Sequence, residues 1–536
     1  MVGKLVIGIA ALALLAFSCG LVFFGEHAAD DATKWSDQLV LFVVGIVVVS
    51  LLHIGACVMT YRMPPRLEIV LLVALAARLI VLFGSSNGPL GGEMDRVQVE
   101  AAQASAGLNP YEFKISELME TPGAATTLQG EAGQRFLLAQ EVVHRDGMPA
   151  LQTIEQPDLR STQTPLAQWI GVLAERSMSD SRQGYAFLAL LADALAIFLL
   201  VMALMEMGKP VGLIMIYAWS PVLLHEVYGA MSVDVFVLPG IAGVILCIAK
   251  GRKLLTVLPL ALAGAFRPVM LLLLPLVWRR LGMAGAVLLG FLTLLPLLPF
   301  LATVTSAEAY LDGPLTVLSH DAKNSLFVEA AGEALVHVPW KSDRTVTVAG
   351  VTLVSEGDPL GGFLARVAAL LVLVGVLVYG SHHYAARRKH VARARAQAAF
   401  EALLAIVAGI LFVSPVLEPS HTLWLLPLLV VRPALSWMVL PALSGLTYLG
   451  DVPGLDGSPG PIPLPVLVFG AFILLWILDL LWRQRLFGEV PATASDEEWS
   501  IDAGEFAAYD GGSEPQEAPE GPARMVNVPK EERETF

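Results

Sequence analysis

The chain has 536 residues, of which 56% are hydrophobic and 15% are charged. Because soluble domains contain about 45 to 50% apolar residues, this composition excludes a soluble globule and indicates a membrane protein. The 34 basic residues against 48 acidic ones give a net charge of −14, which argues against a nucleic-acid-binding protein.

Long apolar runs follow one another along the chain, most of them near the roughly 20 residues that a helix needs to cross a bilayer. They cover residues 5–24, 39–60, 67–83, 185–205, 211–224, 235–248, 283–301, 360–379 and 466–482. Shorter runs, of a length that suits half-depth or re-entrant helices, cover 254–266, 269–278, 400–413, 422–431 and 437–449. We therefore expect an all-α protein with about 10 to 14 membrane helices.

Lysine and arginine in the short connections predict the orientation, because cytoplasmic loops carry an excess of them. If Lys4 is cytoplasmic, counting the crossings places the other basic connections on the same side. These contain Arg62, Arg66, Lys209, residues 250–253, Arg279, Arg280, residues 387–395, Arg432, Arg483 and Arg485. This count of crossings treats residues 254–278 as a hairpin that turns at Arg267-Pro268. It places two long segments, 84–183 and 302–359, on the external face.

These crossings predict six regions in a cell (cytoplasmic or inner) membrane protein. They are N-terminal membrane helices (1–83), an external loop region with a candidate motif of charged residues, Glu93 to Glu100 (84–183), membrane helices (184–301), a second external loop (302–359), C-terminal membrane helices (360–489) and a disordered acidic cytoplasmic tail (490–536). The tail is rich in Glu, Asp, Gly and Pro and too poor in large apolar residues to fold. The first helix could instead be a cleaved secretory signal.

The strongest local signal opens the first external loop, where the sequence Gly91-Gly92-Glu93-Met94-Asp95-Arg96 is followed by Glu100. A carboxylate at the membrane edge can act as a general base, and a nearby arginine can hold a phosphate. The pattern also predicts a helix from Asp95, with Arg96 and Glu100 one turn apart on the same face. An ordinary solvated, salt-bridged helix would give the same pattern.

This loop resembles the first external loop of the GT-C superfamily, the integral-membrane glycosyltransferases that use polyprenyl-phosphate sugars, and in particular its bacterial mannosyltransferase-like members. Those proteins have an acid, an arginine three positions on, a second acid and then Gly-x-Asn-Pro-Tyr. Here Glu93, Arg96 and Glu100 are in that register, and residues 107–111 read Gly-Leu-Asn-Pro-Tyr.

Further matches to the same family follow in order along the chain. They are Thr164-Pro165-Leu166-Ala167-Gln168; Trp219-Ser220-Pro221 with Glu226 and Asp234; Arg267-Pro268; and Ser414-Pro415 through Glu418 and His421, followed by Leu423 to Pro427. The chain departs from the family pattern at Ser232, which replaces a histidine, and at Glu418 and His421, which replace a histidine and a tyrosine.

The resemblance implies transfer of a mannose-like hexose or a pentose from a polyprenyl-phosphate donor to a lipid or glycan acceptor at the external face, with inversion. It implies Glu93 or Asp95 as the catalytic base, with Glu93 favoured by register. The substrate-binding residues that it implies are Arg96, Glu100, Asn109, Tyr111, Glu226, Asp234, Arg267, Glu418 and His421. Arg267 and Arg96 would hold the leaving phosphate, while Glu226 and Asp234 would bind sugar hydroxyls or pair with Arg267.

Alternatives to this interpretation remain. A secondary transporter or lipid flippase also needs many helices and intramembrane charges, and a scaffold without catalysis would leave the charged residues scattered. No cofactor is indicated, and a divalent metal has weak support because the acidic residues show no ligand spacing. The cysteines, Cys19, Cys57 and Cys247, lie in apolar runs and suggest neither disulfide nor metal site.

Overall fold

The computed structural model describes most of the chain up to residue 477. The described residues are 2–27, 35–62, 64–84, 92–119, 130–146, 154, 157–178, 180–252, 254–301, 310, 313–314, 325, 327–328, 331, 341, 345–348, 351–354, 361–386, 392–414, 416–451, 470–475 and 477. One compact unit covers Met1–Phe487 and a second covers Gly488–Phe536. The predicted acidic tail and most of the run at 466–482 lie outside the described residues.

Three long helices begin the chain: α1 (Val2–His27), α2 (Trp35–Arg62) and α3 (Leu67–Gly84). Helix α1 packs against both α2 and α3. Their outward faces are apolar, with Leu12 70% and Leu72 69% exposed, which suits helices surrounded by lipid tails. The first three predicted membrane helices are therefore present.

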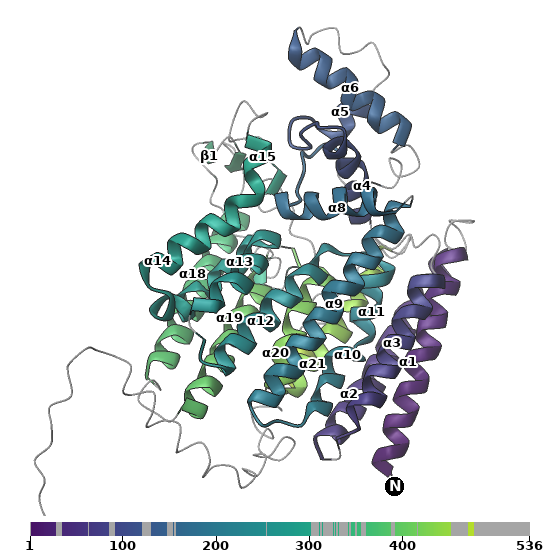
Figure 1. The fold of residues 1–536 in the computed structure, drawn as a ribbon, viewed down its shortest axis with the longest axis vertical. Coiled ribbons are helices and arrows are strands. Elements are labelled where there is room, and N and C mark those ends of the chain that lie inside the picture. The colour runs from purple at the N-terminus through teal and green to yellow at the C-terminus, as the bar shows by residue number, and fades with distance from the viewer. Residues whose placement is uncertain are drawn as a thin grey trace, which may run out of the picture. The chain divides into compact units, whose positions relative to one another are not determined.

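Four shorter helices form the region between α3 and the next long helix: α4 (Gly92–Ser105), α5 (Ile115–Met119), α6 (Glu131–Asp146) and α8 (Pro165–Ser177). They lie beyond one end of the long helices, opposite the end at which the chain begins (Figure 1). A small core of their own, which includes Val99, Leu118, Ala139 and Val143, holds α4, α5 and α6 together. Helix α4 also packs on α8, which in turn packs on α9.

A broken segment follows the long helix α9 (Ser181–Glu206). It consists of η1 (Val211–Ile214), α10 (Met215–Ala218), α11 (Pro221–Leu224) and the π-helical turn η2 (His225–Gly229), and it bends by 53° between Ala218 and Pro221. Pro221 has no N–H to continue the ladder, and the Ser220 hydroxyl caps the new helix by accepting from Leu223 N. The 3₁₀ turn η3 (Val233–Phe236) then leads into α12 (Val237–Ala249).

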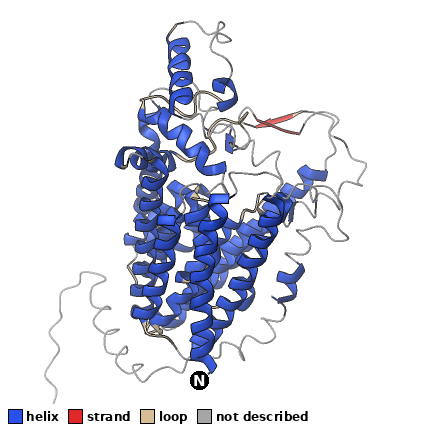
Figure 2. Cartoon of the chain, turned by 90° about the vertical axis from the view of Figure 1, so that its right-hand side faces the viewer, coloured by secondary structure: helices blue, strands red, loops and turns tan. Residues whose placement is uncertain are grey.

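The middle of the chain forms the hairpin that the sequence predicts around Arg267-Pro268. Turn η4 (Leu254–Thr256) and α13 (Val257–Phe266) form its first arm, and η5 (Pro268–Leu273) with the first part of α14 (Leu274–Leu294) forms its second. Helix α14 breaks at Gly282, where φ is 64°, and its second part continues through η6 (Leu295–Leu297) and α15 (Leu298–Leu301) as a separate long apolar span, Leu281–Leu301. A short antiparallel pair, β1 (Val346–Val348) and β2 (Val351–Val354), is drawn red in Figure 2. It is the one departure from an all-helical fold within the described residues.

The C-terminal part contains α18 (Gly361–Ala386), α19 (Ala392–Val413), η8 (Pro419–Leu425), α20 (Leu426–Val431), α21 (Leu435–Ser444) and η9 (Gly445–Asp451). Helix α19 is longer than the sequence predicts, because helix continues back from the apolar run at 400 through Ala392. Its apolar window, Ala396–Val413, is long enough to cross a membrane, so the half-depth helix expected there is instead a full-length one.

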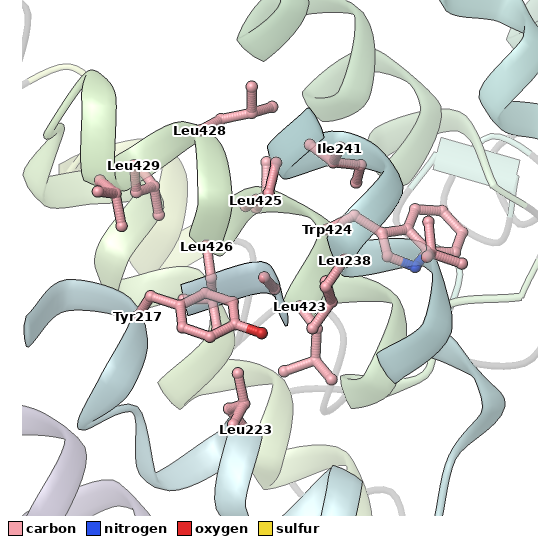
Figure 3. Packing of buried hydrophobic residues seen from close by; sticks show 14 of the residues in the cluster. Tyr217, Leu223, Leu238, Ile241, Leu423, Trp424, Leu425, Leu426, Leu428 and Leu429 are labelled. Carbon is pink, nitrogen blue, oxygen red and sulfur yellow. The ribbon is translucent and has the colours of Figure 1, made fainter. Parts of the chain in front are cut away.

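Across the described residues, seven helices are long and apolar enough to cross a membrane, and the broken segment makes up to eight. The chain is therefore a multi-pass helical membrane protein, and the expected count of about 10 to 14 crossings stays a prediction. Shorter apolar helices, Val233–Ala249, Leu254–Phe266, Pro268–Val277 and Pro419–Val431, pack among them. Leu423 and Trp424 of η8 lie beside Leu238 and Ile241 of α12 in the buried core (Figure 3).

Candidate functional site

Two of the predicted acids, Glu226 and Asp234, lie on one irregular segment, residues 225–234, which we call the acidic turn. It begins as the π-helix η2, passes through Met231 with a φ of 55°, and ends in the 3₁₀ turn η3. The backbone of Ala230 donates to His225 O at 2.8 Å, and that of Ser232 donates to Glu226 O at 2.9 Å. π-helical turns and left-handed non-glycine residues concentrate at functional sites, so this segment is the first candidate.

Asp234 is the centre of a charged cluster drawn from three separate segments of the chain. Arg267, at the tip of the α13–η5 hairpin, donates through Nε to Asp234 Oδ1 at 2.7 Å and through Nη2 to Oδ2 at 3.1 Å. Trp424 of η8 donates its indole N–H to Oδ1 at 3.0 Å. His421 brings Nε2 to 4.0 Å from Oδ2. The predicted residues Asp234, Arg267 and His421 therefore converge.

The two charges of this cluster differ in their access to solvent. The Asp234 side chain is 0% exposed, whereas that of Arg267 is 21% exposed. A buried carboxylate that accepts several hydrogen bonds is compensated for its desolvation, and here it also fixes the plane of the guanidinium. The cation is thus the member of the pair that a ligand can reach, and a fixed guanidinium suits a phosphate.

Glu226, the other acid of the turn, has different partners. It accepts a hydrogen bond from the Tyr448 hydroxyl of η9 at 2.6 Å, and its Oε1 lies 3.7 Å from His225 Nε2. The His225 ring packs on Phe42 and Tyr448 at centroid distances of 4.6 and 5.3 Å. Glu226 is buried. The contact between Glu226 and Tyr448 joins the acidic turn to η9. Of the two acids, it is Asp234 that makes the predicted pair with Arg267.

Glu418 and His421 form a local cap rather than a shared pocket. They meet in a capping box at the start of η8, where the backbone of Glu418 donates to His421 Nδ1 at 3.3 Å. Glu418 is exposed, and His421 stacks near Trp424 with ring centroids 4.9 Å apart. Of the two, His421 is the one that faces Asp234.

The predicted loop motif lies on α4, as its i,i+4 pattern indicates, and Arg96 Nη1 contacts Glu100 Oε1 at 3.4 Å. Glu100 also accepts hydrogen bonds from the Ser161 hydroxyl at 2.8 Å and from the Gln168 amide. Glu100 is 1% exposed, and burial raises its pKa above the ordinary value for a glutamate. Glu100 therefore connects α4 to α8, through Gln168, and to the loop that precedes α8, through Ser161.

The Asn-Pro-Tyr part of the motif is also engaged within the protein. Asn109 accepts from the Tyr111 backbone at 3.0 Å and donates to Phe300 O at 3.0 Å. The buried Tyr111 hydroxyl donates to Gln163 O at 2.8 Å. These contacts connect the loop helices to the end of the α14–α15 segment. They hold the loop region in place, and a contact with substrate by Asn109 or Tyr111 stays a prediction.

Of the two candidate bases, Glu93 and Asp95, the structure describes the side chain of Asp95 alone. Asp95 accepts from Arg182 of α9 at 2.6 Å and is 7% exposed. Glu93 lies in the first turn of α4, but its side chain is outside the described part of the chain. The Asp95 carboxylate is therefore held in an ion pair with Arg182 inside the protein.

The loop network and the Asp234 cluster are neighbours. The Thr164 hydroxyl donates to Phe266 O at 3.2 Å, one residue before Arg267, and α8 packs on α13. Thr164 follows Gln163, the residue that Tyr111 holds. The fold therefore places the predicted loop motif against the hairpin tip that carries Arg267.

A separate small cavity lies in the membrane-embedded core. It is lined mainly by apolar residues of α2, α10, α11, α20 and α21, with Ser50, His53 and Ser220 as its polar groups. His53 contacts Met215 O at 3.0 Å. This cavity does not include Asp234 or Arg267 among its lining residues.

Sequence reasoning missed several residues that complete the site. Trp424, which holds Asp234, lies within the matched segment Leu423 to Pro427 but was given no role there. Tyr448, which holds Glu226, lies in an apolar run that gives no polar signal. Arg78 and Asp193 form an ion pair of 2.5 Å inside apolar helices α3 and α9. Here a signal did exist, because a lone charge within a run of about 20 apolar residues points to a functional role.

The fold and the cluster together define a multi-pass helical membrane protein in which a buried carboxylate, Asp234, pairs with a partly exposed guanidinium, Arg267, next to the loop helices. Within the described residues no group of three or more His, Cys, Asp and Glu side chains could hold a metal ion. Comparisons with models of protein families, with curated proteins and with solved structures found no match to this chain.

Proposed function

We propose that this protein is a glycosyltransferase that moves a sugar, a mannose-like hexose or a pentose, from a polyprenyl-phosphate carrier to a lipid or glycan acceptor on the non-cytoplasmic face of the membrane. The observation that carries the proposal is the convergence of Asp234, Arg267 and His421. These residues come from three of the sequence segments that resemble GT-C elements. Chance matches scattered along apolar helices would have no reason to meet.

The chemistry of the cluster fits a lipid-linked phosphate. A polyprenyl phosphate has an apolar tail that stays among membrane helices and an anionic head that needs a fixed cation at the end of them. Arg267 is such a cation, oriented by Asp234 and 21% exposed, on a hairpin tip next to the loop helices. A guanidinium in this position would stabilise the charge that develops on the departing phosphate.

The proposed reaction is a direct displacement. A carboxylate takes the proton of the acceptor hydroxyl while that oxygen bonds to the anomeric carbon of the sugar. The bond between the anomeric carbon and the phosphate oxygen breaks, the electron pair leaves with the phosphate, and the configuration inverts. We assign the base to Glu93, which the motif register favours, because Asp95 is already engaged by Arg182 at 2.6 Å.

The test is an in-membrane transfer assay with a panel of polyprenyl-phosphate sugars and the protein in native-lipid vesicles. We expect Glu93→Gln to lower the transfer rate at least about a hundredfold, in line with the loss of a general base. Glu131→Gln is the matched control, because Glu131 also lies in the first turn of a loop helix and is 85% exposed. Equal rates for wild type and Glu93→Gln would reject Glu93 as the base, and no transfer from any donor by wild type would refute the glycosyltransferase.

A transporter or lipid flippase is the second candidate. The broken segment with its 53° bend and the ion pair between Arg78 and Asp193 favour it, because discontinuous helices and intramembrane charges are typical of transporters. Movement of a labelled polyprenyl-phosphate sugar from one leaflet to the other in protein-containing vesicles, without transfer of the sugar to any acceptor, would support this alternative over the glycosyltransferase.

A further inference from the structure

The membrane-embedded part of the protein contains an ion pair that lies outside the charged cluster around Asp234. Arg78 of α3 contacts Asp193 of α9 at 2.5 Å, and their side chains are 3% and 0% exposed. Both residues lie within helices that are long and apolar enough to cross a membrane. A fully buried pair of this kind needs a reason for its presence.

The ion pair is joined to the broken segment on both sides of its bend. Arg78 Nη1 donates to Ala218 O at 2.8 Å, which satisfies a carbonyl that the broken helix leaves free. Asp193 Oδ2 accepts from the Tyr228 hydroxyl at 2.8 Å, and Tyr228 is two residues beyond Glu226 in the acidic turn. One ion pair therefore fixes the last residue before the bend and the π-helical turn after it.

Stability alone is a poor explanation for this pair. Arg78 Nη2 and Asp193 Oδ1 have no hydrogen-bond partner among the described residues. Buried ion pairs with unsatisfied atoms are often no more stabilising than apolar residues of the same volume. What an apolar pair cannot supply is a directed hydrogen bond to Ala218 O and to Tyr228.

We propose that Arg78 and Asp193 are positioning residues, which hold the acidic turn in the conformation that presents Glu226 and Asp234. The pair contacts the acidic turn through Tyr228. Two further contacts hold the turn, from Tyr448 to Glu226 and from Arg267 to Asp234. Of these anchors, the Arg78–Asp193 pair is the one whose two residues both lie in helices long and apolar enough to cross a membrane. Its role concerns the shape of the turn and goes beyond any particular reaction there.

The most selective test is Tyr228→Phe, which removes the hydroxyl without leaving a new charge. Hydrogen exchange of the full-length protein in nanodiscs would be followed at the amides of Ala230 and Ser232, whose hydrogen bonds define the turn. We expect exchange there to accelerate about tenfold, with the exchange of α1 and α2 unchanged. Tyr379→Phe, which changes a tyrosine 64% exposed on α18, is the control.

A second variant separates positioning from packing. Arg78→Met/Asp193→Leu replaces the pair by apolar side chains, and we expect its thermal midpoint to match that of wild type while the Ala230 and Ser232 amides exchange about tenfold faster. Wild-type exchange at these amides in the double variant would overturn the proposal. If the double variant does not fold, the Tyr228→Phe variant alone tests the proposal. Wild-type exchange at the Ala230 and Ser232 amides of Tyr228→Phe would then overturn it.

The transfer assay adds a measurement that a purely structural role of the pair would leave unchanged. This measurement rests on the proposed function. In the transfer assay we expect Tyr228→Phe to lower kcat about tenfold with KM unchanged, because the donor lipid still binds while the turn is misplaced. Altered exchange with no transfer by wild type would keep the positioning role and reject the glycosyltransferase. Transfer at the wild-type rate in Tyr228→Phe, together with wild-type exchange at Ala230 and Ser232, would reject the positioning role alone.

Discussion

The pair of Asp234 and Arg267 gives the sharpest prediction, because its geometry allows the cost of disrupting it to be worked out. Asp234→Asn keeps the shape of the side chain and can still accept the Trp424 indole hydrogen bond, which measures 3.0 Å. It loses the charge and one of the two contacts with Arg267, at 2.7 and 3.1 Å. Leaving a fully buried cation unpaired costs about 3 to 5 kcal/mol.

The expected cost here is smaller than that limit. Arg267 is 21% exposed and can turn part of its guanidinium to water, so we expect a loss of about 2 kcal/mol. The measurement is the thermal unfolding midpoint in detergent at a fixed scan rate, since unfolding of a protein this large is often irreversible. Glu401→Gln is the matched control, because it removes the charge from the pair with Arg432. The side chains of Glu401 and Arg432 are 23% and 26% exposed, and a pair in which both side chains reach water contributes about 1 kcal/mol or less.

A double variant then separates stability from phosphate binding. In Asp234→Asn/Arg267→Gln the buried charge is gone and two amides can face each other, so the midpoint should recover towards wild type. Transfer should stay at least about tenfold below wild type, because no cation remains for the leaving phosphate. A midpoint for Asp234→Asn equal to that of wild type, or a double variant as active as wild type, would refute this reasoning.

Three further predictions concern the loop helices. Burial raises the pKa of Glu100, so the folded state holds its proton more tightly and stability falls as pH rises from the unfolded-state pKa towards the folded one; Glu100→Gln should flatten this part of the midpoint-against-pH curve. Tyr111→Phe leaves the buried carbonyl of Gln163 without its 2.8 Å donor and should lower the free energy of unfolding by about 1 to 2 kcal/mol, measured by chemical denaturation. Asp95→Asn removes the charge from the 2.6 Å contact with Arg182 and should cost about 1 kcal/mol in the same measurement, yet retain most of the transfer activity if Glu93 is the base.

Much of the fold could be predicted because apolar runs report helices directly. The helices α1, α2, α3 and α9 match their predicted runs closely, since roughly 20 apolar residues leave little freedom, and α18 begins as predicted but continues past residue 379 to Ala386. The length of α19 was wrong because its first turns are built from Ala and Arg, which favour helix without being apolar. The 53° bend at residues 218–221 was only hinted at by Ser220-Pro221, since a proline kinks some helices and begins others.

The candidate site was harder to predict than the fold. The pairing of Asp234 with Arg267 was one of two roles left open, and the structure has that pair. Its partner Trp424 and the anchor Tyr448 could not be found, because an aromatic residue in an apolar helix is normally a core residue. The substrate-binding roles of Arg96, Asn109 and Glu418 stay predictions, since their contacts within the protein would be the same in a protein without a substrate there.

The small core of the loop helices has a consequence for how the protein loses its structure. Val99, Leu118, Ala139 and Val143 are buried by expelling water, whereas the long helices pack in surroundings as apolar as themselves. Urea weakens the first kind of association and has little to act on in the second. Rising urea should therefore melt the loop helices while the bundle below them stays intact, and Arg267 would lose its neighbours before it loses Asp234.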